Sequence, residues 1–256
     1  MTTRPKTKPE LAAMRESGRM LATVLQLLKA QVAEGISTRQ LADAAKDELQ
    51  KLGGEPAFLG YQGFPAVICI SVNDEVVHGI PRADKIIKEG DIVSLDFGVR
   101  YRGMITDAAI SLIAGKPKQR RHTELIERTL TALQIGIDQL HDQVRTGDIG
   151  SAIENYLKKY HYGLVRDLVG HGVGHELHED PNIPNYGRAG SGPWLNKGLT
   201  IAIEPMVTLG TDRVYIADDH WTVMTADGSW AAHFEHTVLI TADGAEILTG
   251  LPSVNQ

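Results

Sequence analysis

The 256-residue sequence has only one cysteine and no long apolar run, and each shortage excludes a class of protein. A single cysteine, Cys69, excludes an intrachain disulfide and fits a reducing compartment. No apolar stretch approaches the ~18 residues needed to span a bilayer. The basic start of the chain, MTTRPKTKPE, is followed by no apolar region of the kind found in secretory signals. We therefore expect a cytoplasmic protein without a membrane partner.

Positive charge is also in the minority. Lysine and arginine together number 26 against 32 acidic residues, which gives a formal net charge of -6. Mild acidity argues against a DNA-binding domain, because such domains are usually basic. The hydrophobic fraction of 42% and the charged fraction of 23% are ordinary for a globular protein, and the length fits one large domain or two small ones.

Apolar periodicity, caps and breakers predict helices at residues 10–33, 38–52, 119–141 and 151–160, with Ser37 or Thr38 capping the second and Ser151 the fourth. Short β-branched or apolar runs predict strands at residues 66–72, 91–99, 104–113, 199–209 and 233–240. Residues 181–198, rich in proline, glycine and asparagine, predict a long ordered loop. Because helices and strands come in blocks, we expect an α+β fold with an antiparallel sheet.

Two aspartates interrupt the apolar strands of the predicted hairpin, Asp96 in VSLDFGV and Asp107 in GMITDAAIS. They are 107 - 96 = 11 positions apart across one turn, so antiparallel pairing can bring them to one face. Two adjacent carboxylates repel each other unless a proton or a cation lies between them. A divalent metal between them removes this repulsion. The alternative is two aspartates at a sheet edge that point to solvent, and the apolar residues on either side of each aspartate make this alternative less favourable.

The segment GHGVGHELHEDP, residues 170–181, carries His171, His175 and His178 among three glycines. The glycines predict a tight loop or short strand, so His171 and His178 are not a helical zinc pair, and we expect these two to line one cavity in different roles. A lone histidine is more often structural than functional, but three in one glycine-rich segment favour a functional site.

Glu204 in TIAIEPMV and Glu235 in AHFEHTVLI again interrupt apolar runs. Either glutamate alone could be a surface residue. Four acidic residues, each within an apolar strand, are not explained by surface positions. With Asp96, Asp107 and His171 they offer four oxygen donors and one imidazole, a set that suits Mn(II), Fe(II), Co(II) or Mg(II) better than a thiolate-rich structural zinc site. Carboxylates of this kind can bridge two ions, and a water between the ions becomes a nucleophile near neutral pH.

The motifs VNDEVVHGIP, SLDFGV, TDAAIS, GHGVGHELHEDP, IEPM and FEHT, in this order, closely resemble those of type I methionine aminopeptidases, in particular the Gram-positive bacterial branch. The resemblance covers essentially the whole chain. It implies the pita-bread metallopeptidase fold, a curved antiparallel sheet flanked by helices with two halves related by a pseudo-twofold axis. It also implies a single catalytic domain over residues 1–256, after a polar lead of about eight residues.

The resemblance assigns roles to individual residues. It implies that Asp96, Asp107, His171, Glu204 and Glu235 bind two divalent ions, with Glu204 also transferring protons. The water or hydroxide between the ions would attack the scissile carbonyl.

Two further histidines are implied to hold the reacting amide. His78 would contact it near the scissile nitrogen, and His178 would stabilise the oxyanion. Charge stabilisation of that kind is often the largest single catalytic contribution.

The resemblance also implies a pocket for a methionine side chain, lined by Phe58, Tyr61, Phe64, Cys69, His78, Leu177 and Trp221; His178 is implied to bind substrate beside it. Aromatic and soft apolar walls suit a flexible thioether. Taken singly, Phe64 and Trp221 are equally well explained as core residues. Many relatives have phenylalanine at the position of Leu177 and arginine at that of His175, which predicts a slightly wider pocket here.

The expected activity is removal of the initiator methionine from nascent chains whose second residue is small, by a monomer with two ions of iron, manganese or cobalt. Zinc, nickel and magnesium are further candidates. A Na⁺ or K⁺ ion would be held by main-chain oxygens near Asn73, Glu75 and Ala231. The basic run KPKQRRH at residues 116–122 is explained either by a transient ribosome contact or by a solvated loop, and we favour the loop.

Three alternatives fit the sequence less well. An Xaa-Pro aminopeptidase would share the fold, but such enzymes carry a sizeable extra N-terminal domain. Type II methionine aminopeptidases carry a helical insertion between the two glutamates, and the separation of 235 - 204 = 31 positions leaves no room for one. A non-catalytic binding protein of this fold would usually have lost metal ligands, whereas all five are present.

Overall fold

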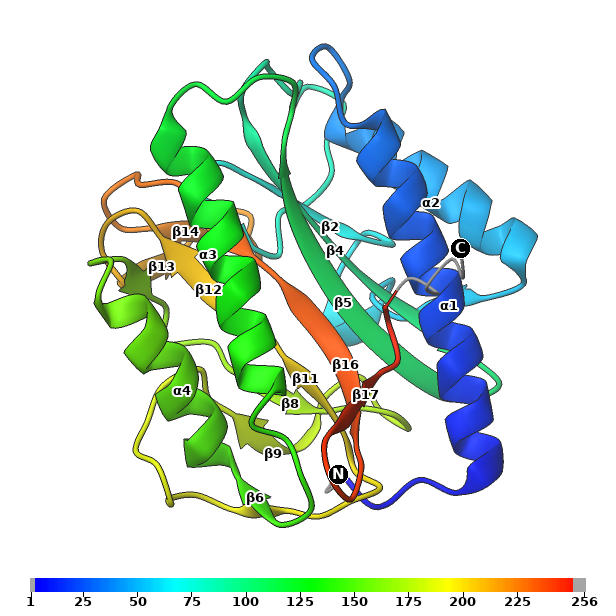
Figure 1. Ribbon diagram of the computed structural model, residues 1–256. Helices are drawn as coiled ribbons and strands as arrows, with labels where there is room; N and C mark the ends of the chain where they lie inside the picture. The colour runs from blue at the N-terminus through cyan, green and yellow to red at the C-terminus, as the bar shows by residue number, and fades with distance from the viewer. Residues whose placement is uncertain (1–2, 251–256) are drawn as a thin grey trace, which may run out of the picture.

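The computed structural model describes residues 3–250, and its main feature is a nine-stranded antiparallel sheet (Figure 1). The strands are ordered β1 (Glu55–Pro56), β4 (Ile92–Tyr101), β5 (Met104–Ile113), β16 (Glu235–Ile240), β11 (Thr200–Ile203), β8 (Gly170–Gly172) and β9 (Glu179–Ile183). In addition, β2 (Cys69–Val72) pairs with β4, and β17 (Ala245–Ile247) pairs with β16. The expected α+β class with an antiparallel sheet is confirmed.

Smaller sheets complete the strand structure. One joins β15 (Ala231–His233), β12 (Met206–Thr208) and β7 (Gly163–Leu164), a second joins β13 (Val214–Ile216), β14 (Val223–Thr225) and β3 (Glu75–Val77), and a third joins β10 (Trp194–Leu195) and β6 (Val144–Arg145). The predicted loop at residues 181–198 therefore contains the end of β9 and all of β10.

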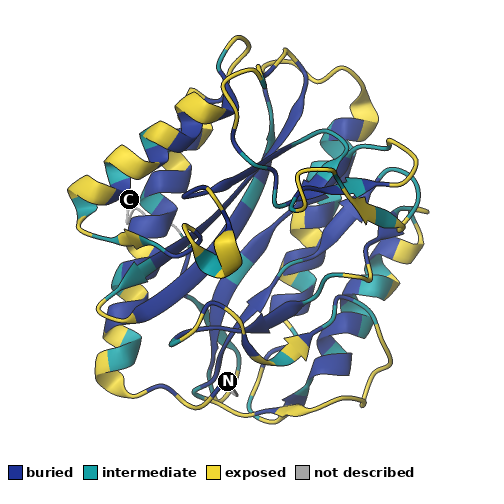
Figure 2. Cartoon of the chain, turned by 180° about the vertical axis from the view of Figure 1, so that it is seen from behind, coloured by how far each residue is buried: buried dark blue, intermediate teal, exposed yellow. Residues whose placement is uncertain are grey.

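Two helix pairs lie on one face of the large sheet, α1 (Lys8–Gln31) with α2 (Thr38–Leu52) and α3 (Arg120–Ile137) with α4 (Thr146–Lys158) (Figure 1). The second helix begins and ends as expected, with a capping box at Ser37 and a left-handed Gly53. Figure 2 shows that the central strands are buried, while the outer faces of the helices are exposed. None of the helices within residues 3–250 combines the length and apolarity needed to cross a membrane.

The predicted start of the fourth helix was wrong. Helix α4 begins at Thr146, so Ser151 lies inside the helix and does not cap it. Helix α4 contains two glycines, Gly147 and Gly150, and each allows close packing against a neighbouring segment. A Cβ at Gly147 would lie 2.3 Å from the Arg188 carbonyl oxygen, and one at Gly150 would lie 2.4 Å from that of Tyr186.

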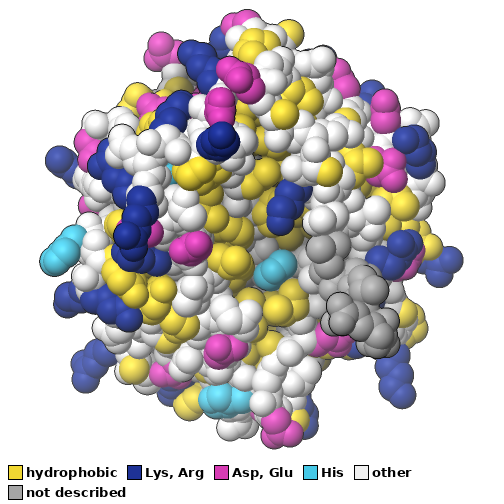
Figure 3. Space-filling view, turned by 45° about the horizontal axis from the view of Figure 1, so that its top comes forward, with side chains coloured by type: hydrophobic (Ala, Val, Ile, Leu, Met, Phe, Trp, Pro, Cys, Tyr) yellow, Lys and Arg dark blue, Asp and Glu magenta, His cyan; other side chains and the backbone are white. Residues whose placement is uncertain are grey.

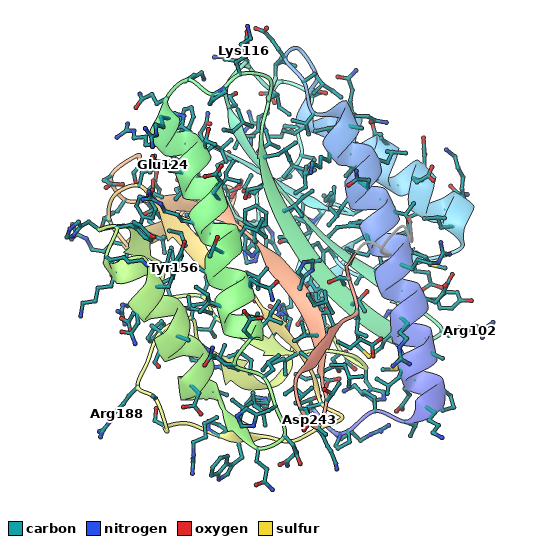
Figure 4. All side chains as sticks on the ribbon, viewed as in Figure 1. Arg102, Lys116, Glu124, Tyr156, Arg188 and Asp243 are labelled. Carbon is teal, nitrogen blue, oxygen red and sulfur yellow. The ribbon has the colours of Figure 1, made fainter. Side chains whose placement is uncertain are left out.

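The predicted β4–β5 hairpin is confirmed, with Ile92 paired to Ile113 and Tyr101 to Met104. Its turn uses positive φ angles at Arg102 (49°) and Gly103 (78°); the Arg102 side chain points away from the sheet (Figure 4). Two later predicted strands are each split in two at a candidate ligand. The run 199–209 breaks between β11 and β12, and the run 233–240 breaks between β15 and β16.

The two helix pairs leave a hollow between them, over β5 and β16. Apolar residues of α1, α3 and the sheet line it, among them Leu25, Ile110, Ile126 and Phe234, together with His236. Figure 3 shows this hollow in the middle of the face, with a histidine surrounded by apolar side chains. The candidate ligands lie in a different cavity.

Candidate metal centre and substrate pocket

One cavity of about 150 Å³ brings together all thirteen residues that the sequence motifs and the family resemblance assigned to the metal centre and the substrate pocket. Its lining consists of Phe58, Tyr61, Gln62, Phe64, Cys69, His78, Asp96, Asp107, His171, Leu177, His178, Glu204, Trp221 and Glu235. Of these, only Gln62 was not anticipated. His175 lies outside the cavity, where its ring Nε2 is 2.8 Å from a carboxylate oxygen of Glu10. The lining divides into an acidic end and an apolar end.

The strand register explains how the carboxylates meet. Asp107 lies opposite Gly98, two positions beyond Asp96, so both aspartates face the same side of the hairpin. Glu235 lies opposite Ala109, which is the residue paired with Asp96 on the other side. Three carboxylates from three adjacent strands therefore point into one small volume.

This grouping is electrostatically costly without a cation. Burial raises the pKa of Asp107 to about 7. Burial, and then the neighbouring carboxylates, raise the pKa values of Asp96, Glu204 and Glu235 well above the ordinary range. Carboxylate oxygens of Asp96, Asp107 and Glu235 have no hydrogen-bond partner among residues 3–250. Since buried polar atoms are nearly always partnered, these oxygens fit divalent cations as ligands.

His171 is oriented for the same purpose. Its Nδ1 lies 2.9 Å from the Gly172 carbonyl oxygen, so this nitrogen carries the proton and donates, which leaves Nε2 with a lone pair. Burial, and then His178, lower the pKa of His171 to about 3, so the ring is neutral at physiological pH. One ligand atom each of Asp107, His171 and Glu235 lie within 4.8 Å of one another, a spacing that a single ion can span.

The two histidines expected to hold the amide lie beside the carboxylates. His178 is at the exposed rim of the cavity, its Nδ1 2.8 Å from the Tyr61 hydroxyl and its ring centroid 4.2 Å from that of His171. His78 has a positive φ of 60°, which is uncommon for a residue with a side chain and often marks a functional constraint. Burial, and then His178, lower the pKa of His78 to about 4.

The other end of the cavity is apolar. Phe64 packs edge-on against Phe58 and Trp221, with ring centroids 6.5 Å and 5.1 Å apart. Leu177 is only 3% exposed, and the Cys69 thiol is also buried; burial raises the pKa of that thiol well above its usual range. The wall therefore suits an uncharged, flexible side chain of moderate length.

Sequence reasoning missed His233, which is buried next to the carboxylates and forms a second possible ligand group with Glu204 and Glu235. A signal was present: His233 and Glu235 are two positions apart in an extended run, a spacing that places both side chains on one face.

Comparison with known proteins identifies the family. The model of metallopeptidase family M24 matches residues 12–242. The methionine aminopeptidase of Mycoplasma capricolum is 45% identical over 244 residues, which cover 95% of this chain and 97% of the relative. The crystal structure of a methionine aminopeptidase from Thermotoga maritima matches with a TM-score of 0.95 at 44% identity, over 97% of this chain and 99% of the other.

A more distant match shares the fold over only part of its length. The prolidase of Pyrococcus furiosus matches with a TM-score of 0.77 at 26% identity, over 96% of this chain but only 65% of the prolidase. The chain therefore belongs to metallopeptidase family M24 and has its pita-bread fold. Within that family, it belongs to the bacterial type I methionine aminopeptidases.

Proposed function

We propose that the protein is a metal-dependent aminopeptidase that removes the N-terminal methionine of peptides, nascent chains included, when the second residue is small. The family and its full-length relatives support this activity. The observation that carries it to this chain is the shape of the cavity, which joins an apolar pocket directly to a cluster of buried carboxylates. A short peptide can place its first side chain in the pocket and its first peptide bond over the carboxylates.

The proposed metal ligands are Asp96, Asp107, His171, Glu204 and Glu235. When bound there, divalent ions would supply Lewis acidity and lower the pKa of a shared water toward neutrality. Iron, manganese and cobalt are the proposed ions, because the set combines four carboxylates with one imidazole and has no thiolate; zinc, nickel and magnesium are further candidates.

The chain's own groups then orient the substrate and move protons. Glu204 is proposed to accept a proton at its carboxylate and to deliver it to the leaving amine. His178 Nδ1 lies 2.8 Å from the Tyr61 hydroxyl. The proposed tautomer is the one in which this hydroxyl donates to Nδ1, so that Nε2 carries the proton and can donate to the scissile carbonyl oxygen. His78 is neutral near pH 7 because burial lowers its pKa, and it is proposed to contact the scissile amide.

We propose that residues 1–256 form a single catalytic domain, because both halves contribute candidate ligands. The proposed Na⁺ or K⁺ site is supported by proximity: the Ala231 amide donates to the Asn73 carbonyl oxygen at 2.8 Å, so the two segments lie side by side.

A ribosome contact through residues 116–122 stays a separate prediction. Two charges of this segment are engaged within the protein, since Lys118 pairs with Asp91 at 2.7 Å and Arg120 with Glu124 at 2.8 Å. Lys116 extends away from the body of the protein (Figure 4). Neutralising Lys116 and Arg121 should weaken co-sedimentation with ribosomes at low salt, and unchanged binding would remove the idea.

The activity is tested with two tripeptides. Protein stripped of metal and reloaded with Mn(II) or Co(II) should release methionine from Met-Ala-Ser and leave Ala-Pro-Ala intact. Absence of release with every divalent ion would refute the proposal. Preferential cleavage of Ala-Pro-Ala would instead assign an Xaa-Pro aminopeptidase.

A further inference from the structure

His233 is held rigidly by its backbone while its side chain is left without partners. Its backbone N–H donates to the Ser111 hydroxyl oxygen at 2.8 Å, and the same hydroxyl donates to the His233 carbonyl oxygen at 2.8 Å. The residue is 2% exposed, yet neither ring nitrogen has a hydrogen-bond partner among the described residues 3–250. At least one ring nitrogen of a buried imidazole normally has a hydrogen-bond partner, so the two unpartnered nitrogens of this ring need an explanation.

The ring points into the carboxylate cluster. Its Nε2 lies 3.7 Å from Oε2 of Glu204, while the other oxygen of that carboxylate, Oε1, lies 3.5 Å from Nε2 of His171. Both distances are too long for hydrogen bonds. They are close to the about 3–3.6 Å that separates two ligand atoms each about 2.1 Å from one ion.

A second ligand group follows from this arrangement. One ligand atom each of Glu204, His233 and Glu235 lie within 4.8 Å of one another, as do those of Asp107, His171 and Glu235. The two groups share Glu235, and each contains one imidazole.

We propose that His233 is a further metal ligand, which binds an ion through Nε2 together with Glu204 and Glu235. This inference rests on the proposed metal-dependent function and extends the five-residue ligand set. It gives the centre two imidazole donors, and imidazole suits iron, zinc, nickel and copper better than magnesium.

The proposal is tested by counting histidine ligands directly. Protein labelled with nitrogen-15 histidine is stripped of metal, loaded with cadmium-113 and measured by NMR. Two imidazole nitrogens, one from His171 and one from His233, should show splitting by the cadmium nucleus. A single split nitrogen in the unaltered protein would overturn the proposal, and this measurement requires no variant to fold. Failure of the unaltered protein to bind any metal would refute the proposed function itself.

Two variants assign the signals. His233→Gln should remove one split nitrogen, leave that of His171 and weaken cadmium binding about tenfold or more. His122→Gln is the matched control, because His122 is also buried with an unpartnered ring nitrogen among residues 3–250 but stacks on Trp230, outside the cavity lining. The control should keep both split nitrogens. If His233→Gln weakens binding while both splittings persist, His233 acts only by positioning Glu204 and the proposal is wrong.

Discussion

The Lys6 ammonium lies 3.1 Å from Oε2 of Glu179, and both side chains are cut off from solvent, with exposed fractions of 0% and 1%. The other oxygen of Glu179 accepts from the backbone N–H groups of His175 and Glu176. This pair therefore ties the segment before α1 to the short loop that carries Leu177 and His178.

Removing one member of this pair should destabilise the fold strongly. Lys6→Met leaves Glu179 buried without its cation, and we expect the free energy of unfolding to fall by about 3–5 kcal/mol in urea titrations. The matched control is Arg15→Met, which breaks the exposed Arg15–Glu246 pair and should cost less than about 1 kcal/mol. Similar losses in both variants would show that burial of the Lys6 pair has no special weight.

Glu204→Gln should separate catalysis from substrate binding. The amide keeps the shape of the side chain but cannot accept a proton, so at saturating metal we expect kcat to fall by about 10²–10⁴ with little change in KM. Measurement of methionine release across substrate concentrations gives both constants. The control Glu176→Gln alters an exposed glutamate near the cavity and should leave both unchanged. A full-rate Glu204→Gln enzyme would exclude the proposed proton transfer.

Tyr61 and His178 should act as one unit. His178→Ala removes the donor to the carbonyl oxygen and should lower kcat/KM by about 10²–10³. Tyr61→Phe removes only the hydroxyl 2.8 Å from Nδ1, which is proposed to hold the proton on Nε2, so the fall in kcat/KM should be smaller. In the double variant, Tyr61→Phe should add nothing to the loss caused by His178→Ala. Additive losses would mean that the hydroxyl works independently of the histidine.

Leu177→Phe should narrow the apolar pocket. We expect the preference for methionine over ethionine, which is longer by one methylene, to rise by about tenfold or more in kcat/KM. Leu59→Phe makes the same change at a residue that is 53% exposed, and it should leave the preference unchanged. An unchanged preference in Leu177→Phe would remove this residue from the specificity pocket.

The metal-free protein should become less stable as the pH rises. A carboxyl whose pKa is raised in the folded state stabilises the fold at low pH, and this contribution is lost as the pH rises through the folded-state value, about 7 for Asp107 and well above normal for Asp96, Glu204 and Glu235. Buried histidines with lowered pKa values act in the opposite sense, but only below about pH 6.5, where unfolded imidazoles are charged.

Urea midpoints measured above about pH 6.5 should therefore fall with pH in the presence of chelator. With saturating Mn(II), the ionised carboxylates gain a partner and the fall should disappear. A midpoint in chelator that rises over this range would contradict the assignment.

Much of the site could be predicted because its chemistry conflicts with its surroundings. Asp96 and Asp107 lie in apolar strands, where a carboxylate is costly unless a cation binds it. The predicted turn at Arg102 and Gly103 places the two aspartates on the same face of the hairpin. The pocket residues, by contrast, came only from the resemblance, because Phe64 or Trp221 reads equally well as core.

Two features were beyond the sequence pattern. Helix α4 begins at Thr146 and not near residue 151, and its Gly147 and Gly150 allow the carbonyl oxygens of Arg188 and Tyr186 to approach closely, which no periodicity reveals. The spacing of His233 from Glu235 indicates a shared face, but the proposed role of His233 also depends on its distance to Glu204, which no local periodicity encodes.

The pairing of β5 with β16 has one more consequence. Asp96 and Asp107 come from one half of the chain and His171, Glu204 and Glu235 from the other, and this pairing joins the two halves. An ion bound by both groups would be a crosslink that forms only when residues 235 - 96 = 139 positions apart have already met. Peptidase activity would then require that the two halves have already paired, so a chain in which only one half is folded could not cleave peptides.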